Sequence, residues 1–143
     1  YDMGAAVEGG LGGHAGLFGN AFDVAVVLQM YIQGGYYGGK KLLSKSVINQ
    51  FNTCYYCDKD NRRGVGFDKP ELNDGSSDCK GQPSPTSFGH YGFTGTYAWA
   101  DPENEMVIVF LSNRTYPTMD NKLLGKHNIR TRVREVVYKA LVD

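Results

Sequence analysis

Apolar positions follow a helical rhythm in the first third of the chain. Residues 21–33 (AFDVAVVLQMYIQ) are apolar on nearly every face of a helix, which predicts a helix buried between other elements. Asn20 can cap this helix, and Asp23 at its third position makes a variant of the capping box. Gly34 and Gly35 are expected to end it.

Two further helices are predicted from shorter patterns. Ser44 is a candidate N-cap for a helix that places three apolar residues on one face: Val47, Ile48 and Phe51. Near the C-terminus, apolar residues recur at helical spacing and predict a final helix: Ile129, Val133, Val136, Val137, Ala140 and Leu141. The glycine-rich first 19 residues predict a loop.

Between these helices the pattern changes to that of a hairpin. Residues 94–100 predict one strand, residues 101–104 a turn, and residues 106–112 (MVIVFLS) the returning strand. The second strand is apolar at consecutive positions, so both of its faces should be covered. Helices followed by an antiparallel hairpin and a helix that can pack on it predict an α+β fold.

The composition fits a single soluble globular domain. The chain has 143 residues, of which 41% are apolar and 21% are charged. Its 15 basic and 15 acidic residues cancel, so no net charge attracts nucleic acid or an anionic membrane. The longest apolar run is too short to span a bilayer, and no signal peptide is visible. We therefore predict no nucleic-acid partner and no membrane span.

Residues 54–87 are interpreted as an inserted loop region. They are polar and interrupted by Gly, Pro, Asn and Asp, and only residues 64–68 (GVGFD) predict a strand there. Cys54 and Cys57 have the spacing of half a zinc site.

The third cysteine, Cys79, could complete such a site together with His14 or His90. No second closely spaced Cys/His pair follows, so we predict no metal. One disulfide, or free thiols, is the favoured interpretation of these cysteines.

Two stretches carry a family resemblance: residues 12–44 (GGHAGLFGNAFDVAVVLQMYIQGGYYGGKKLLS) and residues 89–117 (GHYGFTGTYAWADPENEMVIVFLSNRTYP). In this order they resemble the C-terminal half of the serine β-lactamase and penicillin-binding-protein superfamily, in particular its class C-like branch of esterases and D-amino-acid peptidases. The sequence HAGLF (residues 14–18) also resembles that of the module fused to family 3 glycoside hydrolases. The resemblance implies a partial β-lactamase/transpeptidase-like fold, with an antiparallel sheet and packed helices. Residues 1–143 would form a single partial domain that lacks the N-terminal strands and the nucleophile lobe.

The resemblance also implies a role for FGHYGFTGT (residues 88–96), whose glycines and hydroxyls are poor material for a core. In the superfamily the third motif, Lys/His-Thr/Ser-Gly, lines one wall of the substrate cleft on an edge strand. The resemblance places His90 at the cationic or hydrogen-bonding position of this motif and Tyr91 at its hydroxyl position. Tyr91 departs from the usual Thr or Ser. Gly92 lies where a Cβ would collide with substrate, and the N–H of Phe93 is one of two oxyanion donors.

Two further residues are candidates for substrate contact. His14 could approach the same cleft from the glycine loop, although a structural role is an equal alternative. Asn113 lies where the family places a polar group near the cleft, and the alternative there is a cap at the strand end.

The nucleophile and base motifs of the superfamily, Ser-x-x-Lys and Tyr-x-Asn, have no convincing match. Tyr-x-Asn and Ser-x-Asn are absent from the sequence. Ser77 and Lys80 match Ser-x-x-Lys literally, but the surrounding Gly/Ser/Asp/Pro loop offers no helix to hold the two side chains on one face. We therefore expect the chain to start downstream of both motifs and to carry only one wall of the active site.

The predicted function is that of the C-terminal part of a serine hydrolase in an exported, periplasmic bacterial protein. It would act by acyl transfer on a β-lactam, a peptidoglycan-type amide or an ester, without a cofactor, and the isolated chain would be inactive. The alternatives are a non-catalytic peptide- or glycan-binding module and a small zinc-binding domain. Apolar surface on the hairpin and on residues 21–33 predicts self-association, or docking to the missing part.

Overall fold

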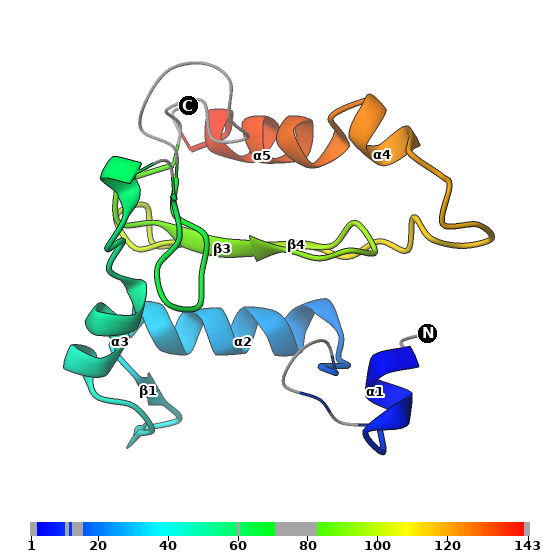
Figure 1. Ribbon diagram of the computed structural model, residues 1–143. Coiled ribbons are helices and arrows are strands. Elements are labelled where there is room, and N and C mark those ends of the chain that lie inside the picture. The colour runs from blue at the N-terminus through cyan, green and yellow to red at the C-terminus, as the bar shows by residue number, and fades with distance from the viewer. Residues whose placement is uncertain (1–2, 11, 13–15, 60, 71–82, 142–143) are drawn as a thin grey trace.

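The computed structural model describes residues 3–10, 12, 16–59, 61–70 and 83–141, and it has the α+β architecture that the sequence predicts (Figure 1). An antiparallel sheet has the strand order β3-β4-β5, made of β3 (Phe88–Tyr91), β4 (Tyr97–Asp101) and β5 (Met106–Phe110). Two helices cover its opposite faces, α2 (Ala21–Ile32) below and α5 (Ile129–Lys139) above in Figure 1.

Shorter elements surround these layers: α1 (Met3–Val7), β1 (Tyr36–Tyr37), β2 (Lys40–Lys41), α3 (Lys45–Asn52), the 3₁₀ turn η1 (Cys57–Lys59) and α4 (Leu123–Lys126). The two-residue strands β1 and β2 pair with each other in a separate antiparallel ribbon. In the described part of the chain, every helix is too short or too polar to cross a membrane.

Side-chain caps confirm both predicted helix starts. Oδ1 of Asn20 accepts from the N–H of Asp23 at 3.1 Å, and the Asp23 carboxylate accepts from the N–H of Asn20 at 3.4 Å. Oγ of Ser44 accepts from the N–H of Val47 at 3.2 Å. Gly34 follows α2 with a φ of 68°, the left-handed conformation that glycine adopts without strain. These boundaries were predictable because each depends on only a few neighbouring residues.

β4 begins later than predicted because residues 93–95 form a turn. The N–H of Gly92 donates to the carbonyl of Thr96 at 2.9 Å, and the N–H of Gly95 donates back to the carbonyl of Gly92 at 3.0 Å. Gly95 has a φ of 94°, whereas the two residues before it have negative φ. The loop is therefore a type I turn closed by a left-handed glycine. Thr94, predicted as the first strand residue, lies within it.

The sheet separates two clusters of buried side chains. On the α5 face lie Tyr97, Trp99, Ile108 and Tyr138. On the α2 face lie Leu28, Phe88 and Ala100, with Val107 and Val109 packed against them. Both faces of β5 are therefore covered, as its consecutive apolar residues predicted.

The face that α5 buries follows its apolar pattern only in part. Its buried residues are Thr131, Arg134 and Tyr138, whereas Val136 is 67% exposed. The hydroxyl of Tyr138 donates to the carboxylate of Asp101, a fully buried side chain, at 2.7 Å. Val137, a residue of the predicted apolar pattern, packs against the cluster on this face. The most buried positions are nevertheless the three named above, because the interface also takes in polar groups such as the Tyr138 hydroxyl, whose acceptor lies within it.

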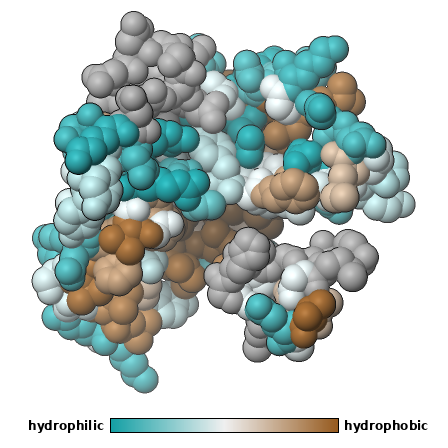
Figure 2. All heavy atoms as spheres, viewed as in Figure 1, coloured by the Kyte–Doolittle hydropathy of each residue, from teal (hydrophilic) through white to brown (hydrophobic). Residues whose placement is uncertain are grey.

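The apolar surface predicted on residues 21–33 is present, and on the hairpin it is limited to part of the predicted residues, among them Leu111, which is 44% exposed. Phe22 is 75% exposed and Val27 is 49% exposed, and hydrophobic side chains gather over the α2–α3 half of the visible face (Figure 2). The inward-facing hairpin residues Tyr97 and Trp99 are instead buried, because α5 covers them. Self-association through the exposed helix surface stays a prediction.

Candidate active site

The main-chain groups of β3 point alternately toward β4 and toward the open edge of the sheet. Gly89 points outward: its N–H donates to the carbonyl of Asp68 at 3.1 Å, and its carbonyl accepts from the N–H of Asp68 at 2.8 Å. By the same alternation, the main-chain groups of Tyr91 face away from β4, and Phe93 follows within the turn of residues 93–95. The predicted cleft wall is thus the part of the edge that follows the Asp68 bridge.

His90 is exposed on this edge, and both of its ring nitrogens have partners. Nδ1 lies 2.8 Å from the carbonyl oxygen of Tyr91, which can only accept, so Nδ1 carries the proton. Nε2 lies 3.4 Å from Nη1 of Arg63 and accepts from it. Nε of Arg63 forms an ion pair with Oδ1 of Asp68 at 3.2 Å. This series of contacts fixes the orientation of the imidazole ring on the edge.

The side chain of Tyr91 faces the interior of the protein. Its ring centroid lies 5.1 Å from that of Tyr97, and the guanidinium carbon of Arg130 lies 4.7 Å from the same ring. The Tyr91 hydroxyl oxygen is buried. The arrangement therefore does not support a hydroxyl directed at a substrate carboxylate, and only the main chain of Tyr91 faces the edge.

Gly92 and Phe93 form the corner where β3 enters the turn. A Cβ on Gly92 would collide with the hydroxyl of Thr96, so packing within the hairpin already requires glycine there. The Phe93 carbonyl accepts from Nε of Arg114 at 2.8 Å, and the Arg114 guanidinium carbon lies 4.7 Å from the centre of the Phe93 ring. Among the hydrogen bonds of the described residues, none uses the N–H of Phe93. The corner therefore presents a donor and no uncommitted acceptor.

Arg114 is a residue that the sequence reasoning missed. Besides its bond to Phe93, its main-chain N–H donates to the carbonyl of Thr94 at 2.9 Å. Its Nη1 donates to the carbonyls of Met119 at 3.4 Å and Asn121 at 3.3 Å. It thereby ties the turn to the segment that follows β5. The Asn-Arg pair in the second resembling stretch was the available signal, but only its asparagine was considered.

The remaining predicted residues are placed less directly. Asn113 lies beside the turn, next to Arg114, and its side-chain oxygen accepts from the Thr115 hydroxyl at 2.7 Å. Its contact with a substrate stays a prediction. His14 and the Ser77–Lys80 match fall outside the described residues.

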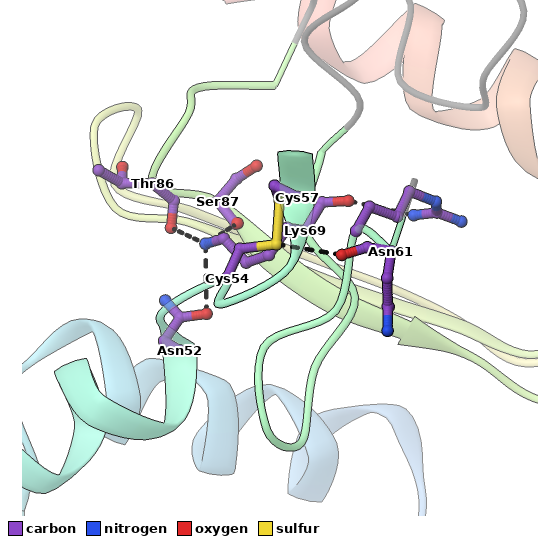
Figure 3. The surroundings of a disulfide bond; sticks show 8 residues. Asn52, Cys54, Cys57, Asn61, Lys69, Thr86 and Ser87 are labelled. Carbon is purple, nitrogen blue, oxygen red and sulfur yellow. Dashed lines mark hydrogen bonds between the residues drawn. A yellow bond between two sulfur atoms is a disulfide. The ribbon is translucent and has the colours of Figure 1, made fainter. Parts of the chain in front are cut away.

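The segment interpreted as an insertion is connected to the sheet. Residues 64–68, predicted as a strand, contribute only isolated bridges from Asp68, one to Arg63 and one to Gly89. Cys54 and Cys57 form a disulfide, one of the two alternatives favoured from the sequence (Figure 3). No cluster of three possible metal ligands occurs among the described residues, which do not include Cys79.

Lys69 is a buried lysine near this disulfide that the sequence did not reveal. Its ammonium donates to Oδ1 of Asn52 at 3.2 Å and to the carbonyls of Thr86 at 3.2 Å and Ser87 at 2.6 Å (Figure 3). Three donors thus meet three acceptors, and the bonds join α3 to the segment that leads into β3. Burial lowers the pKa of Lys69 from 10.5 to about 8, and the negative charge of Asp101 opposes part of that change.

The lowered pKa predicts that the chain becomes more stable in mildly alkaline solution. Between pH 8 and pH 10.5 the unfolded state holds the Lys69 proton more tightly than the folded state, so raising the pH favours folding. We expect this group to add up to about 3 kcal/mol to the free energy of unfolding across that window. Urea unfolding of the wild type and of Lys69→Met at several pH values measures the difference. Lys40→Met, which removes an exposed lysine, should keep the wild-type slope, and equal slopes in all three proteins would contradict the prediction.

Two cavities lie near α3 rather than at the predicted cleft wall. One of about 770 Å³ is lined by residues of α2, α3 and the disulfide together with Lys69, Thr86 and Glu103. The other, of about 310 Å³, is mostly apolar and lies between α2, α3 and Phe67. The described residues around neither cavity include His90 or Phe93. Among the described residues, His90 and Phe93 are exposed at the predicted wall, and Tyr91 and Gly92 between them are half-buried.

Comparison with known proteins identifies the family of the chain. The model of the family described as "Beta-lactamase" matches residues 1–130. The chain therefore belongs to the β-lactamase family, and with it to the serine β-lactamase and penicillin-binding-protein superfamily that the two stretches resemble.

Relatives from enteric bacteria point to the same class. Proteins of Salmonella enteritidis PT4 and Salmonella typhi are each 38% identical over 114 residues, which is 79% of this chain and 26% of each relative. A protein of Escherichia coli O157:H7 is 39% identical over 109 residues, 76% of this chain and 24% of that relative. All three carry the name "Putative D-alanyl-D-alanine carboxypeptidase". The chain thus spans about a quarter of the length of these relatives.

Proposed function

We propose that the edge at residues 90–93 is one wall of the active site of a serine hydrolase that works by acyl transfer. The observation that carries this proposal is the uncommitted N–H of Phe93. It lies in a corner whose carbonyls are already bonded, at the position of an oxyanion donor in the family motif. A group that only donates suits an oxygen that becomes negative during the reaction.

In the proposed reaction a serine hydroxyl attacks the carbonyl carbon of a β-lactam, a peptidoglycan-type amide or an ester. The C–O bond forms as the serine proton passes to a base, and the carbonyl oxygen carries the negative charge until the leaving group departs with a proton. The Phe93 N–H would stabilise that charge. The described residues supply this wall, and the serine and base would come from elsewhere in the complete gene product.

The names of the relatives favour an amide of D-alanine among these substrates. Peptidoglycan-type amides occur outside the bacterial cytoplasm, so the proposal includes an exported, periplasmic protein. Residues 1–143 alone are proposed to be inactive.

Acylation by a fluorescent penicillin tests the proposal. The complete product of the gene should become covalently labelled, because its serine attacks the lactam, and residues 1–143 alone should stay unlabelled. Gel fluorescence followed by peptide mapping identifies the modified serine. Labelling of the isolated chain at Ser77 would contradict the dismissal of the Ser77–Lys80 match. A complete product that stays unlabelled yet binds D-Ala-D-Ala peptides would replace the proposal with the non-catalytic binding module.

A further inference from the structure

The disulfide between Cys54 and Cys57 closes a small ring directly after α3. Cys54 lies two residues beyond the last residue of α3, and Cys57 is only three positions further along the chain. A bond between such close neighbours removes less freedom from the unfolded chain than a bond between distant residues, so it stabilises the fold less. It also joins no two helices or strands that are far apart in the chain. The pair is therefore poorly suited to be a structural clamp.

The same disulfide is accessible from outside. Cys57 is exposed, whereas Cys54 is half-buried. Both cysteines line the cavity of about 770 Å³ near α3. This volume lies within the range of pockets that bind small molecules, so the cavity can admit a low-molecular-weight thiol. Exposed disulfides are the ones that exchange with thiols, because the attacking sulfur must reach them. Cys57, the more exposed residue of the pair, is the one that such a thiol meets first.

The surroundings of Cys54 suit its reduced form. Its Sγ lies 3.3 Å from the main-chain carbonyl oxygen of Asn61 (Figure 3). A carbonyl oxygen can only accept, and a sulfur in a disulfide carries no proton, so this contact is not a hydrogen bond while the disulfide is intact. Once Cys54 is a thiol, its S–H can donate to this oxygen across the same contact. The fold therefore already contains an acceptor for the product of reduction.

We propose that Cys54 and Cys57 are a redox-active pair that reacts with low-molecular-weight thiols. A thiolate attacks Sγ of Cys57, the bond to Cys54 breaks as the new S–S bond forms, and Cys54 leaves as a thiolate that takes a proton from solvent. A second thiolate attacks the sulfur of the first one and releases Cys57, which is protonated in turn. Two thiols are thereby oxidised to one disulfide, and the pair is reduced to a dithiol. This activity needs no serine and is independent of the acyl transfer proposed above.

Titration of the complete gene product with glutathione tests the proposal. The protein is incubated in mixtures of reduced and oxidised glutathione, free thiols are trapped with iodoacetamide, and mass spectrometry of the digest gives the state of Cys54 and Cys57. We expect the pair to convert reversibly between disulfide and dithiol while circular dichroism stays native, and the transient glutathione adduct to lie on Cys57. A disulfide that opens only after the protein is unfolded would overturn the inference and leave a purely structural bond.

Two matched variants test which sulfur is attacked. Cys54→Ser leaves the exposed Cys57 as the single thiol of the pair, and Cys57→Ser leaves Cys54 beside its acceptor. We expect Cys57 to be alkylated by iodoacetamide about tenfold faster than Cys54, because it is more exposed and no carbonyl holds its proton. Equal rates, or a faster Cys54, would contradict the assigned order of attack. The titration of the wild type needs neither variant, and penicillin labelling tests the acyl transfer separately.

Discussion

Replacing Phe93 with proline is expected to lower kcat of the complete gene product by about 10²- to 10³-fold, the usual cost of losing one oxyanion donor. Proline removes the Phe93 N–H, which bonds to no other group among the described residues. Position 93 is the second residue of a type I turn, where proline is favoured, so the loop can keep its shape.

Phe93→Ala is the matched control for this experiment. It keeps the N–H but removes the ring on which Arg114 lies, so it measures the effect of the side chain alone. We expect less than about a tenfold change in kcat, since the 2.8 Å bond from Arg114 to the Phe93 carbonyl remains. Steady-state hydrolysis of a chromogenic β-lactam or ester, with circular dichroism as a check on folding, gives both values. Equal losses in the two variants would assign the effect to the ring and remove the oxyanion role from residue 93.

Replacing Asp101 with alanine should cause the largest loss of stability, more than about 3 kcal/mol of unfolding free energy. The buried carboxylate accepts from the Ser84 hydroxyl at 2.6 Å, the Ser84 N–H at 2.9 Å, the Tyr138 hydroxyl at 2.7 Å and the Asn104 amide at 2.9 Å. Alanine would leave the donors of Ser84 and Tyr138, which are buried residues, without their acceptor. Chemical denaturation of the chain measures the loss, and Asp58→Ala, an exposed carboxylate in η1, should change stability by less than about 0.5 kcal/mol.

Acid should affect stability through the same carboxylate. Burial alone would raise the pKa of Asp101, but the hydrogen bonds from Ser84, Tyr138 and Asn104 outweigh it and lower the pKa below 3.8. The stability from this group is thus complete above the unfolded-state pKa and is lost as the pH falls through the lower folded-state value. Asp101→Asn should show a shallower loss in acid. If Asp101→Ala were as stable as the wild type, the hydrogen bonds to the Asp101 carboxylate would contribute little to stability.

The sequence predicted those parts of the fold that depend on neighbouring residues. Asn20 and Ser44 bond to main-chain groups three residues away, and the consecutive apolar residues of β5 required cover on both faces. The family resemblance located the edge at His90. The turn at residues 93–95 was missed because the threonines around Gly95 favour a strand as readily as a loop.

Buried polar groups account for most of what the sequence could not show. Lys69, Asp101 and Arg134 are all buried, yet charged residues are expected on the surface unless partners are known. The oxygens that receive the Lys69 ammonium come from α3 and from the segment before β3. Arg63 reaches His90 from 27 residues away in the sequence. Such pairings depend on tertiary contacts, which the local pattern of apolar and polar residues in one sequence does not reveal.

The β-bridge between Asp68 and Gly89 also affects the tendency of the protein to aggregate through its edge strand. An uncapped outer strand is a template on which a neighbouring copy can add its own strand, the first step toward fibrils. Here Gly89 is paired within the chain, the His90 ring takes the Tyr91 carbonyl, and Arg114 takes that of Phe93. The outward carbonyls along β3 are therefore already bonded within the chain. The same contacts that define the proposed ligand-binding edge thus disfavour the addition of a strand from a second molecule.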